Sequence, residues 1–198
     1  MKNIYCTIIT TVLLFALEVR AQDFQYLEYK GSNLISTHGM TFSLDIPPGF
    51  KKLSPINYQA VFNEHPFNVT IAVLIDEHKF IMVSAEELAD RAGFLDYSYH
   101  KPVTLSGLKF FLRESCHADL SLEKINSSKD VAYVQKNGFD LTKPTILYSF
   151  FTSSEDGNSE YIVHYAKHVS SCGDGTISDD FKLDFMTEIE KNITVKRM

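Results

Sequence analysis

The feature that most constrains this chain is a two-residue alternation that runs from Val103 to Leu120. One face is apolar apart from Glu114, and the other is polar apart from Phe111. A period of two is typical of a β-strand with one face on a core and the other in water. We therefore predict one long strand over this stretch. Its apolar face carries Leu108, Phe110, Leu112, Cys116, Ala118 and Leu120, and its polar face Lys109, Arg113, Ser115, His117 and Asp119.

The first 21 residues have the pattern of a secretory signal peptide. Lys2 supplies the positive start, residues 8–17 are almost wholly apolar, and small side chains before the junction predict cleavage between Ala21 and Gln22. The apolar run is well short of the ~20 residues that span a bilayer. We therefore expect an exported bacterial protein, periplasmic or secreted, with no membrane span once the leader and its Cys6 are removed.

Charge and length limit the partners and the number of domains. Removing the leader, with Lys2, Arg20 and Glu18, takes the formal charge from −6 to −7 (−6 − 2 + 1). An acidic chain without a basic run argues against nucleic acid as a partner. Residues 22–39 are polar and read as a loosely held lead-in, and residues 40–198 as one domain, expected to be monomeric.

Two cysteines remain after cleavage, Cys116 and Cys172. Export permits disulfides, and an even cysteine count favours pairing. The pair would tie the long strand to the segment that leads into the last helix. The alternative is two buried free thiols.

The rest of the chain reads as further strands and two amphipathic helices. Strands are predicted at 41–46, 59–63, 69–75, 145–152 and 160–169, and 123–137 is either helical or a loop. A capping box at Ser84–Glu87 predicts a helix of about twelve residues. Ser178 is expected to cap a final helix. The apolar stripe of the first helix is Ala85, Leu88, Ala89, Ala92 and Leu95, and that of the last is Phe181, Phe185, Ile189 and Ile193.

The order of these segments, together with two motifs, resembles the PsbP/Mog1-like family. The motifs are an early Ile46-Pro47-x-Gly49-Phe50 and a strand that begins after Leu105-Ser106-Gly107. The resemblance covers roughly residues 40–195. It implies an α+β fold, an α/β/α sandwich in which helices pack on both faces of an antiparallel sheet. It also implies binding or accessory work, and it carries no functional residue onto this sequence.

Several polar residues are candidate catalytic groups or metal ligands. His117 and Asp119 share a strand face and are weak metal candidates that would need a third ligand. Ser115 lies on the same face, but a neighbour in sequence does not activate it. His164 and His168 are too far apart on a strand for one ion, and Cys116 and His117 point to opposite faces. We therefore predict no catalytic residue, no metal and no cofactor.

Two further sequence patterns are explained without a functional site. Asp174, Asp179 and Asp180 lack the spacing of a calcium loop and fit helix capping. The sequons at Asn68, Asn126 and Asn192 matter only in a glycosylating host.

The sequence favours an exported, non-catalytic binding or accessory protein of the bacterial envelope, with an unknown protein or small-molecule ligand. One alternative is a periplasmic immunity protein against a basic toxin, because a small acidic domain suits such a partner. The other is a hydrolytic enzyme of unknown class. A pocket that gathers His117, Asp119 or His164 would favour the enzyme.

Overall fold

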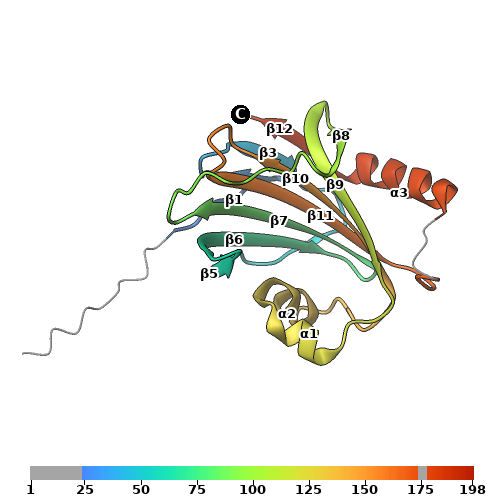
Figure 1. Ribbon diagram of the computed structural model, residues 1–198. Helices are drawn as coiled ribbons and strands as arrows, with labels where there is room; N and C mark the ends of the chain where they lie inside the picture. Colours follow the sequence, from blue (N-terminus) through green and yellow to red (C-terminus); the bar gives the residue numbers. More distant parts are fainter. Residues whose placement is uncertain (1–23, 174–177) are drawn as a thin grey trace, which may run out of the picture.

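The computed structural model describes residues 24–173 and 178–198, and its centre is an eight-stranded antiparallel sheet (Figure 1). The strand order is β4-β6-β7-β11-β10-β9-β8, and β5 pairs with β6 on the same side as β4. The strands are β4 (Lys51–Lys52), β5 (Ile56–Phe62), β6 (His65–Ile75), β7 (Lys79–Leu88), β8 (Lys101–Leu105), β9 (Leu108–His117), β10 (Thr145–Ser153) and β11 (Ser159–His168).

A second, four-stranded sheet lies over one face of the first. Its order is β1-β2-β3-β12, so both ends of the described chain meet in it. Its strands are β1 (Leu27–Lys30), β2 (Asn33–Ser36), β3 (Phe42–Asp45) and β12 (Thr194–Arg197). Three helices complete the fold: α1 (Leu122–Ser127), α2 (Lys129–Lys136) and α3 (Asp179–Asn192).

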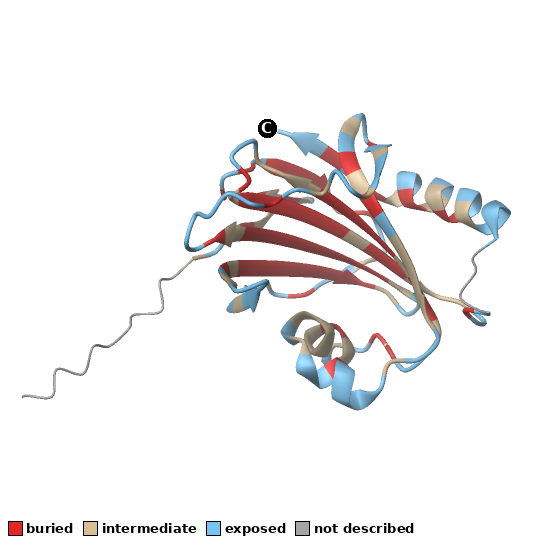
Figure 2. Cartoon of the chain, in the orientation of Figure 1, coloured by how far each residue is buried: buried red, intermediate tan, exposed pale blue. Residues whose placement is uncertain are grey.

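Alternation along the central strands divides the core into two clusters, one on each face of the large sheet (Figure 2). The first cluster joins the large sheet to the small sheet and to α3. The second joins it to α1, α2 and β5. The β6, β7, β10 and β11 strands are therefore covered on both faces, which explains their nearly continuous runs of buried residues.

The expected α/β/α sandwich is wrong. Strands hold 47% of the described residues and three short helices only 16%, so the protein is mostly antiparallel β-sheet. The main cover on one face is the four-stranded sheet, whose short strands carry little periodic signal. Helices therefore do not form the two outer layers that the family resemblance implied.

The helix expected after Ser84 is also wrong, because residues 79–88 form β7. This strand is hydrogen-bonded to β6 on one side and to β11 on the other, and two ladders outweigh a local capping pattern. Residues 89–95 then run as an irregular segment against the β10–β11 turn. Gly93 has φ +67°, and a Cβ there would lie 2.9 Å from the Asp156 carbonyl oxygen, so no other residue fits this contact.

The long strand predicted over 103–120 is two strands. Ser106 and Gly107 both have positive φ and form a two-residue hairpin turn between β8 and β9. The face assignment within β9 is nevertheless confirmed: Phe110 and Leu112 are buried in the first cluster, and Arg113 is exposed.

The segment 22–39 is more ordered than a loose lead-in, because its described part forms β1 and β2. Strands at 41–46, 59–63, 69–75, 145–152 and 160–169 are confirmed within a few residues, and 123–137 holds α1 and α2. The last helix is confirmed as α3, with the Ser178 side chain accepting a hydrogen bond from the Phe181 amide. Of its predicted stripe, Phe185, Ile189 and Ile193 are buried and Phe181 is 37% exposed. The predicted leader lies outside the described residues, and within those residues no helix is long and apolar enough to cross a bilayer.

Cys116 and Cys172 form a disulfide, as the sequence predicts, with their Cα atoms 5.6 Å apart. Cys116 lies near the end of β9 on the face toward the first core cluster. Cys172 follows β11 and precedes α3. The bond therefore ties the segment that leads into α3 to the end of β9, near one edge of the large sheet.

We expect the double change Cys116→Ser and Cys172→Ser to lower the free energy of unfolding by about 2–4 kcal/mol. The loop spans 56 residues in sequence, and closing a loop of this size removes about 4 kcal/mol of chain entropy from the unfolded state. Urea denaturation of oxidised wild type and of the variant measures the difference, with Ser170→Ala as the control. Equal stability of the two proteins would contradict this prediction.

Candidate functional site

The face of the large sheet opposite the four-stranded sheet is only partly covered. There α1 and α2 supply Ile125 and Val134 to a cluster centred on β6 and β7, while the polar side of β9 stays open (Figure 2). We call this open region the Arg113 face. It consists of Phe111, Arg113, Ser115 and His117 on β9, Leu147, Ser149 and Phe151 on β10, His164 on β11, and His100 from the segment before β8.

Phe151 is the centre of this face. The Arg113 guanidinium lies 5.3 Å from its ring centroid, in a cation–π arrangement. Tyr97 and His100 stack on the same ring at centroid distances of 4.8 and 5.7 Å. Phe151 is therefore only 6% exposed although no helix covers it. The cover is a layer of polar and aromatic side chains with a cation at its edge.

Arg113 has no carboxylate partner in any ion pair of the described residues. The same holds for two other cations of this region, Lys109, whose ammonium lies 5.0 Å from the Phe111 ring centroid, and Lys124 near His117. This part of the surface is thus locally basic in a chain of net charge −6.

Three histidines surround the guanidinium, and each has a lowered pKa. Burial is the main cause for all of them, and the Arg113 charge acts in the same direction. For His117 the Lys124 ammonium adds to the effect. The pKa of His164 falls to about 4, because burial and Arg113 outweigh the opposing charge of Asp130. At neutral pH the imidazoles are therefore uncharged.

A buried carboxyl pair lies beside this face, toward α2. Glu86 and Glu160 are directly opposite each other on β7 and β11, and they are 8% and 4% exposed. The Tyr97 hydroxyl donates a hydrogen bond to Glu160 Oε2. Tyr97 thus connects the carboxyl pair to the ring of Phe151.

The two carboxyls differ in how readily each gives up its proton. Burial raises the pKa of both, to about 7 for Glu160 and well above the ordinary range for Glu86. Glu160 accepts hydrogen bonds from Tyr97 and from Glu86, which favour its ionised form, whereas the nearby charges of Glu160 and Asp130 hold the proton on Glu86. Once the pH exceeds about 7, the pair therefore carries a negative charge on Glu160 while the proton stays on Glu86.

One pair of side chains, Ser149 and His164, resembles a catalytic arrangement but is not accessible to a substrate. Ser149 Oγ lies 2.9 Å from His164 Nδ1, within hydrogen-bond distance. Ser149 is only 1% exposed, so its hydroxyl is not presented to a substrate, and an imidazole with a pKa near 4 is a weak base at neutral pH. This geometry gives no support to a serine nucleophile.

The metal candidates named from sequence do not assemble. His117 is the last residue of β9, and Asp119 is exposed beyond the strand end. Within residues 24–173 and 178–198, no three His, Cys, Asp or Glu side chains gather in a way that could hold a metal ion. His168 accompanies His164 on β11, but it stacks on Phe139 and contacts the Asp140 carbonyl oxygen, in a separate environment.

The other residues weighed from sequence have structural roles where they are described. Cys116 is in the disulfide and faces away from His117. Asp179 and Asp180 lie in the first turn of α3, as capping predicts, and Asp174 lies outside the described residues. No sequence pattern groups Glu86, Glu160, Tyr97 and Arg113, because only the folding of distant segments brings them together.

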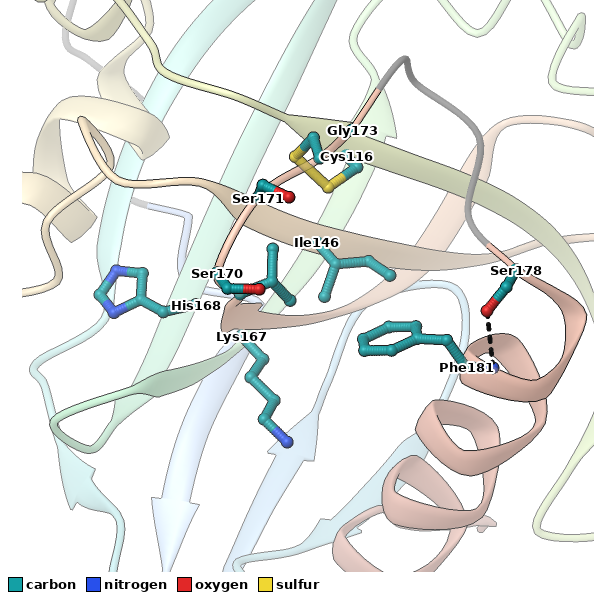
Figure 3. A pocket seen from close by; sticks show the side chains of 11 residues that line it. Cys116, Ile146, Lys167, His168, Ser170, Ser171, Gly173, Ser178 and Phe181 are labelled. Atoms are coloured by element: carbon teal, nitrogen blue, oxygen red, sulfur yellow. Dashed lines mark hydrogen bonds between the residues drawn. A yellow bond between two sulfur atoms is a disulfide. The ribbon is translucent and has the colours of Figure 1, made fainter.

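A separate hollow of about 430 Å³ lies between the end of β11, the disulfide and the first turn of α3 (Figure 3). In this view the Ile146 and Phe181 side chains lie near each other, with Cys116 and Ser171 above them and Ser178 to the right. Lys167 is engaged elsewhere, because its ammonium donates to Glu188 at 2.7 Å. Its lining includes Gly173 and Ser178, which flank a stretch that is not described, so we assign it no ligand.

Comparison with known proteins adds no relative: no family model, no curated protein and no solved structure matches this chain.

We expect Glu86→Gln to make the protein more stable than wild type at pH 8, by roughly 1–3 kcal/mol, with a smaller difference at pH 5. The folded-state pKa values of the pair lie above the ordinary glutamate value. The stability they contribute is therefore complete below about pH 4.5 and is lost as the pH rises through about 7. Glutamine keeps a donor for Glu160 but cannot ionise.

Urea unfolding of both proteins at several pH values between 5 and 8 measures this difference. Glu123→Gln, at an exposed position of α1, is the matched control. A variant whose stability runs parallel to that of wild type across this range would contradict the assignment of the proton to Glu86.

Proposed function

We propose that this chain is an exported, non-catalytic binding protein and that the Arg113 face receives an acidic segment of a protein partner. The observation that carries the proposal is Arg113 itself, an exposed guanidinium held over Phe151 with no carboxylate partner among the described residues. Arginine beside aromatic rings is the composition enriched at protein interfaces. Desolvated on binding, such a guanidinium pairs strongly with a carboxylate.

A protein partner fits this surface better than a small molecule does. Small-molecule sites are concave and enclose their ligand. Of the hollows found on the described part of the chain, the one beside the β10–β11 turn includes Lys109 and Phe111 at the edge of this face, but none is lined by Arg113, Phe151 or His100. The Arg113 face is instead a strand surface with one aromatic layer. Its exposed Tyr99, 75% accessible beside His100, extends the aromatic area.

The positive charge of the Arg113 face argues against the immunity protein, one of the two alternatives that the sequence left open. An immunity protein against a basic toxin would present carboxylates, whereas this face presents Arg113, Lys109 and Lys124. A serine hydrolase would need an accessible nucleophile, and Ser149, the serine beside His164, is buried. Export is supported by the predicted leader and by the disulfide, which persists in oxidising compartments.

We expect a hexaglutamate peptide to bind this face weakly and to lose roughly threefold to tenfold in affinity when Arg113 is changed to Gln. Binding should strengthen as the pH falls from about 7.5 to 5.5, because a carboxylate nearby raises the pKa of His100 and His117 and draws protons onto them. It should weaken with salt. Nuclear magnetic resonance titration of the ¹⁵N-labelled protein measures affinity and location together.

The matched control is Lys51→Gln, which removes an exposed cation from β4 at the far edge of the sheet. Inorganic phosphate and hexalysine are the comparison probes. Hexaglutamate binding that survives Arg113→Gln would contradict the proposal. Tight binding of phosphate at the same residues would replace the protein partner by a small anion.

A further inference from the structure

The outer edge of β5 is an unprotected strand. Its sequence, Ile-Asn-Tyr-Gln-Ala-Val-Phe, has no charge, no proline and no glycine. It pairs with β6 on one side only, and no further backbone hydrogen bond is recorded for it within the described chain. Such a strand offers free N–H and C=O groups to another strand.

The other edge strands that the structure describes are guarded, meaning that each carries charged residues or a proline that hinder pairing with a further strand. On the far side of the large sheet, β8 has Lys101 and Pro102. In the small sheet, β1 has Glu28 and Lys30, and β12 ends in Lys196-Arg197. The short β4 is Lys51-Lys52. Charges and proline are the usual means by which edges avoid pairing, so their absence from β5 alone singles out this edge.

Apolar side chains are exposed where β5 ends. Val61 is 69% and Phe62 48% exposed, and Phe94 beside them is 37% exposed. Phe62 touches Phe67 with ring centroids 5.3 Å apart, which fixes its ring on the helix side of the sheet. The surface that adjoins the free edge is thus apolar as well.

We propose that two copies of this chain associate by antiparallel pairing of β5 with β5. The register that pairs all seven residues places the two-fold axis at Gln59, so that Gln59 faces its own copy and Ile56 faces Phe62 of the partner. Residues opposite each other point to the same face. The helix-side row Ile56, Tyr58, Ala60 and Phe62 then meets the same row in reverse order.

A groove is present where Phe62 of the second copy would arrive. Its volume is about 370 Å³, and it lies between β5 and α2. Ile56, Tyr58, Ala132 and Tyr133 supply apolar walls, and Lys129 Nζ lies 5.3 Å from the Tyr58 ring centroid. An exposed ring on each copy thus matches a groove on the other, as an isologous interface requires.

The same features favour a second copy over an unrelated peptide. The strand is uncharged and its helix-side row is self-complementary, so the strand pairing itself brings no charged side chains face to face. A single seven-residue strand pair is smaller than a standard stable interface. We therefore expect a weak, concentration-dependent dimer, in contrast to the monomer expected from the sequence. This inference is independent of the Arg113 face, which lies on the β9 side of the sheet.

The test uses charge at the two-fold axis. Gln59 is exposed, so Gln59→Lys and Gln59→Glu should each fold normally, yet each should shift the protein to monomer because like charges would face each other. An equimolar mixture of the two variants should recover a heterodimer at least as strong as the wild-type dimer. Sedimentation velocity up to about 1 mM and native mass spectrometry measure both, with circular dichroism as the folding check.

The matched control is the pair Thr104→Lys and Thr104→Glu on the guarded edge strand β8, where Thr104 is also exposed. Each Thr104 variant should form the same proportion of dimer as wild type. A second variant, Phe62→Ser, should weaken the dimer at least tenfold if the ring fills the groove. Wild-type protein that stays monomeric throughout, or a mixture of the Gln59 variants that does not associate, overturns the proposal.

Discussion

The antiparallel pairing of β7 with β11 is the constraint on which the rest of this structure depends. It joins a hairpin from the first half of the chain, β6–β7, to the β9–β10–β11 meander of the second half. Neither unit covers both of its faces alone. Once joined, they form a sheet wide enough to bury one face against the four-stranded sheet and α3 and the other against α1 and α2. The same ladder sets Glu86 opposite Glu160, so the most unusual electrostatic feature of the core follows from the central pairing.

How far the sequence predicts this fold depends on how local each signal is. The alternation of β9, the strand patterns of β6, β10 and β11 and the cap of α3 are all local, and each is confirmed. The helix expected from Ser84 failed because a capping box is weaker than two complete ladders. The small sheet was mostly missed because β1, β2 and β12 are four residues each and gain their stability from burial against distant strands. That omission led to helices being assigned as the outer layers.

The candidate site, too, could be predicted only where its signals are local in the sequence. The disulfide was predictable, since only two cysteines remain after the expected cleavage and β9 places one of them on the core side. The polar face of β9 was recognised as well, with Arg113 and His117 on it. Its significance was not, because Phe151 from β10 contacts Arg113 and is in turn stacked by Tyr97 and His100 from the segment before β8, so the group forms only in the folded chain. Residues near each other in sequence, such as His117 and Asp119, drew attention that the folded geometry does not support.

Tyr97 links the carboxyl pair to the Arg113 face, and this link has a physical consequence for binding. Its hydroxyl donates to Glu160 while its ring stacks on Phe151, so the negative charge of the pair fixes the position of the layer that covers Phe151. A buried charge that accepts two hydrogen bonds is satisfied without a cation. Arg113 is therefore not needed to neutralise Glu160 and stays on the surface, 5.3 Å from the Phe151 ring. A core that satisfies its own carboxylate in this way leaves the Arg113 guanidinium without a carboxylate partner among the described residues, as the proposed binding of an acidic segment requires.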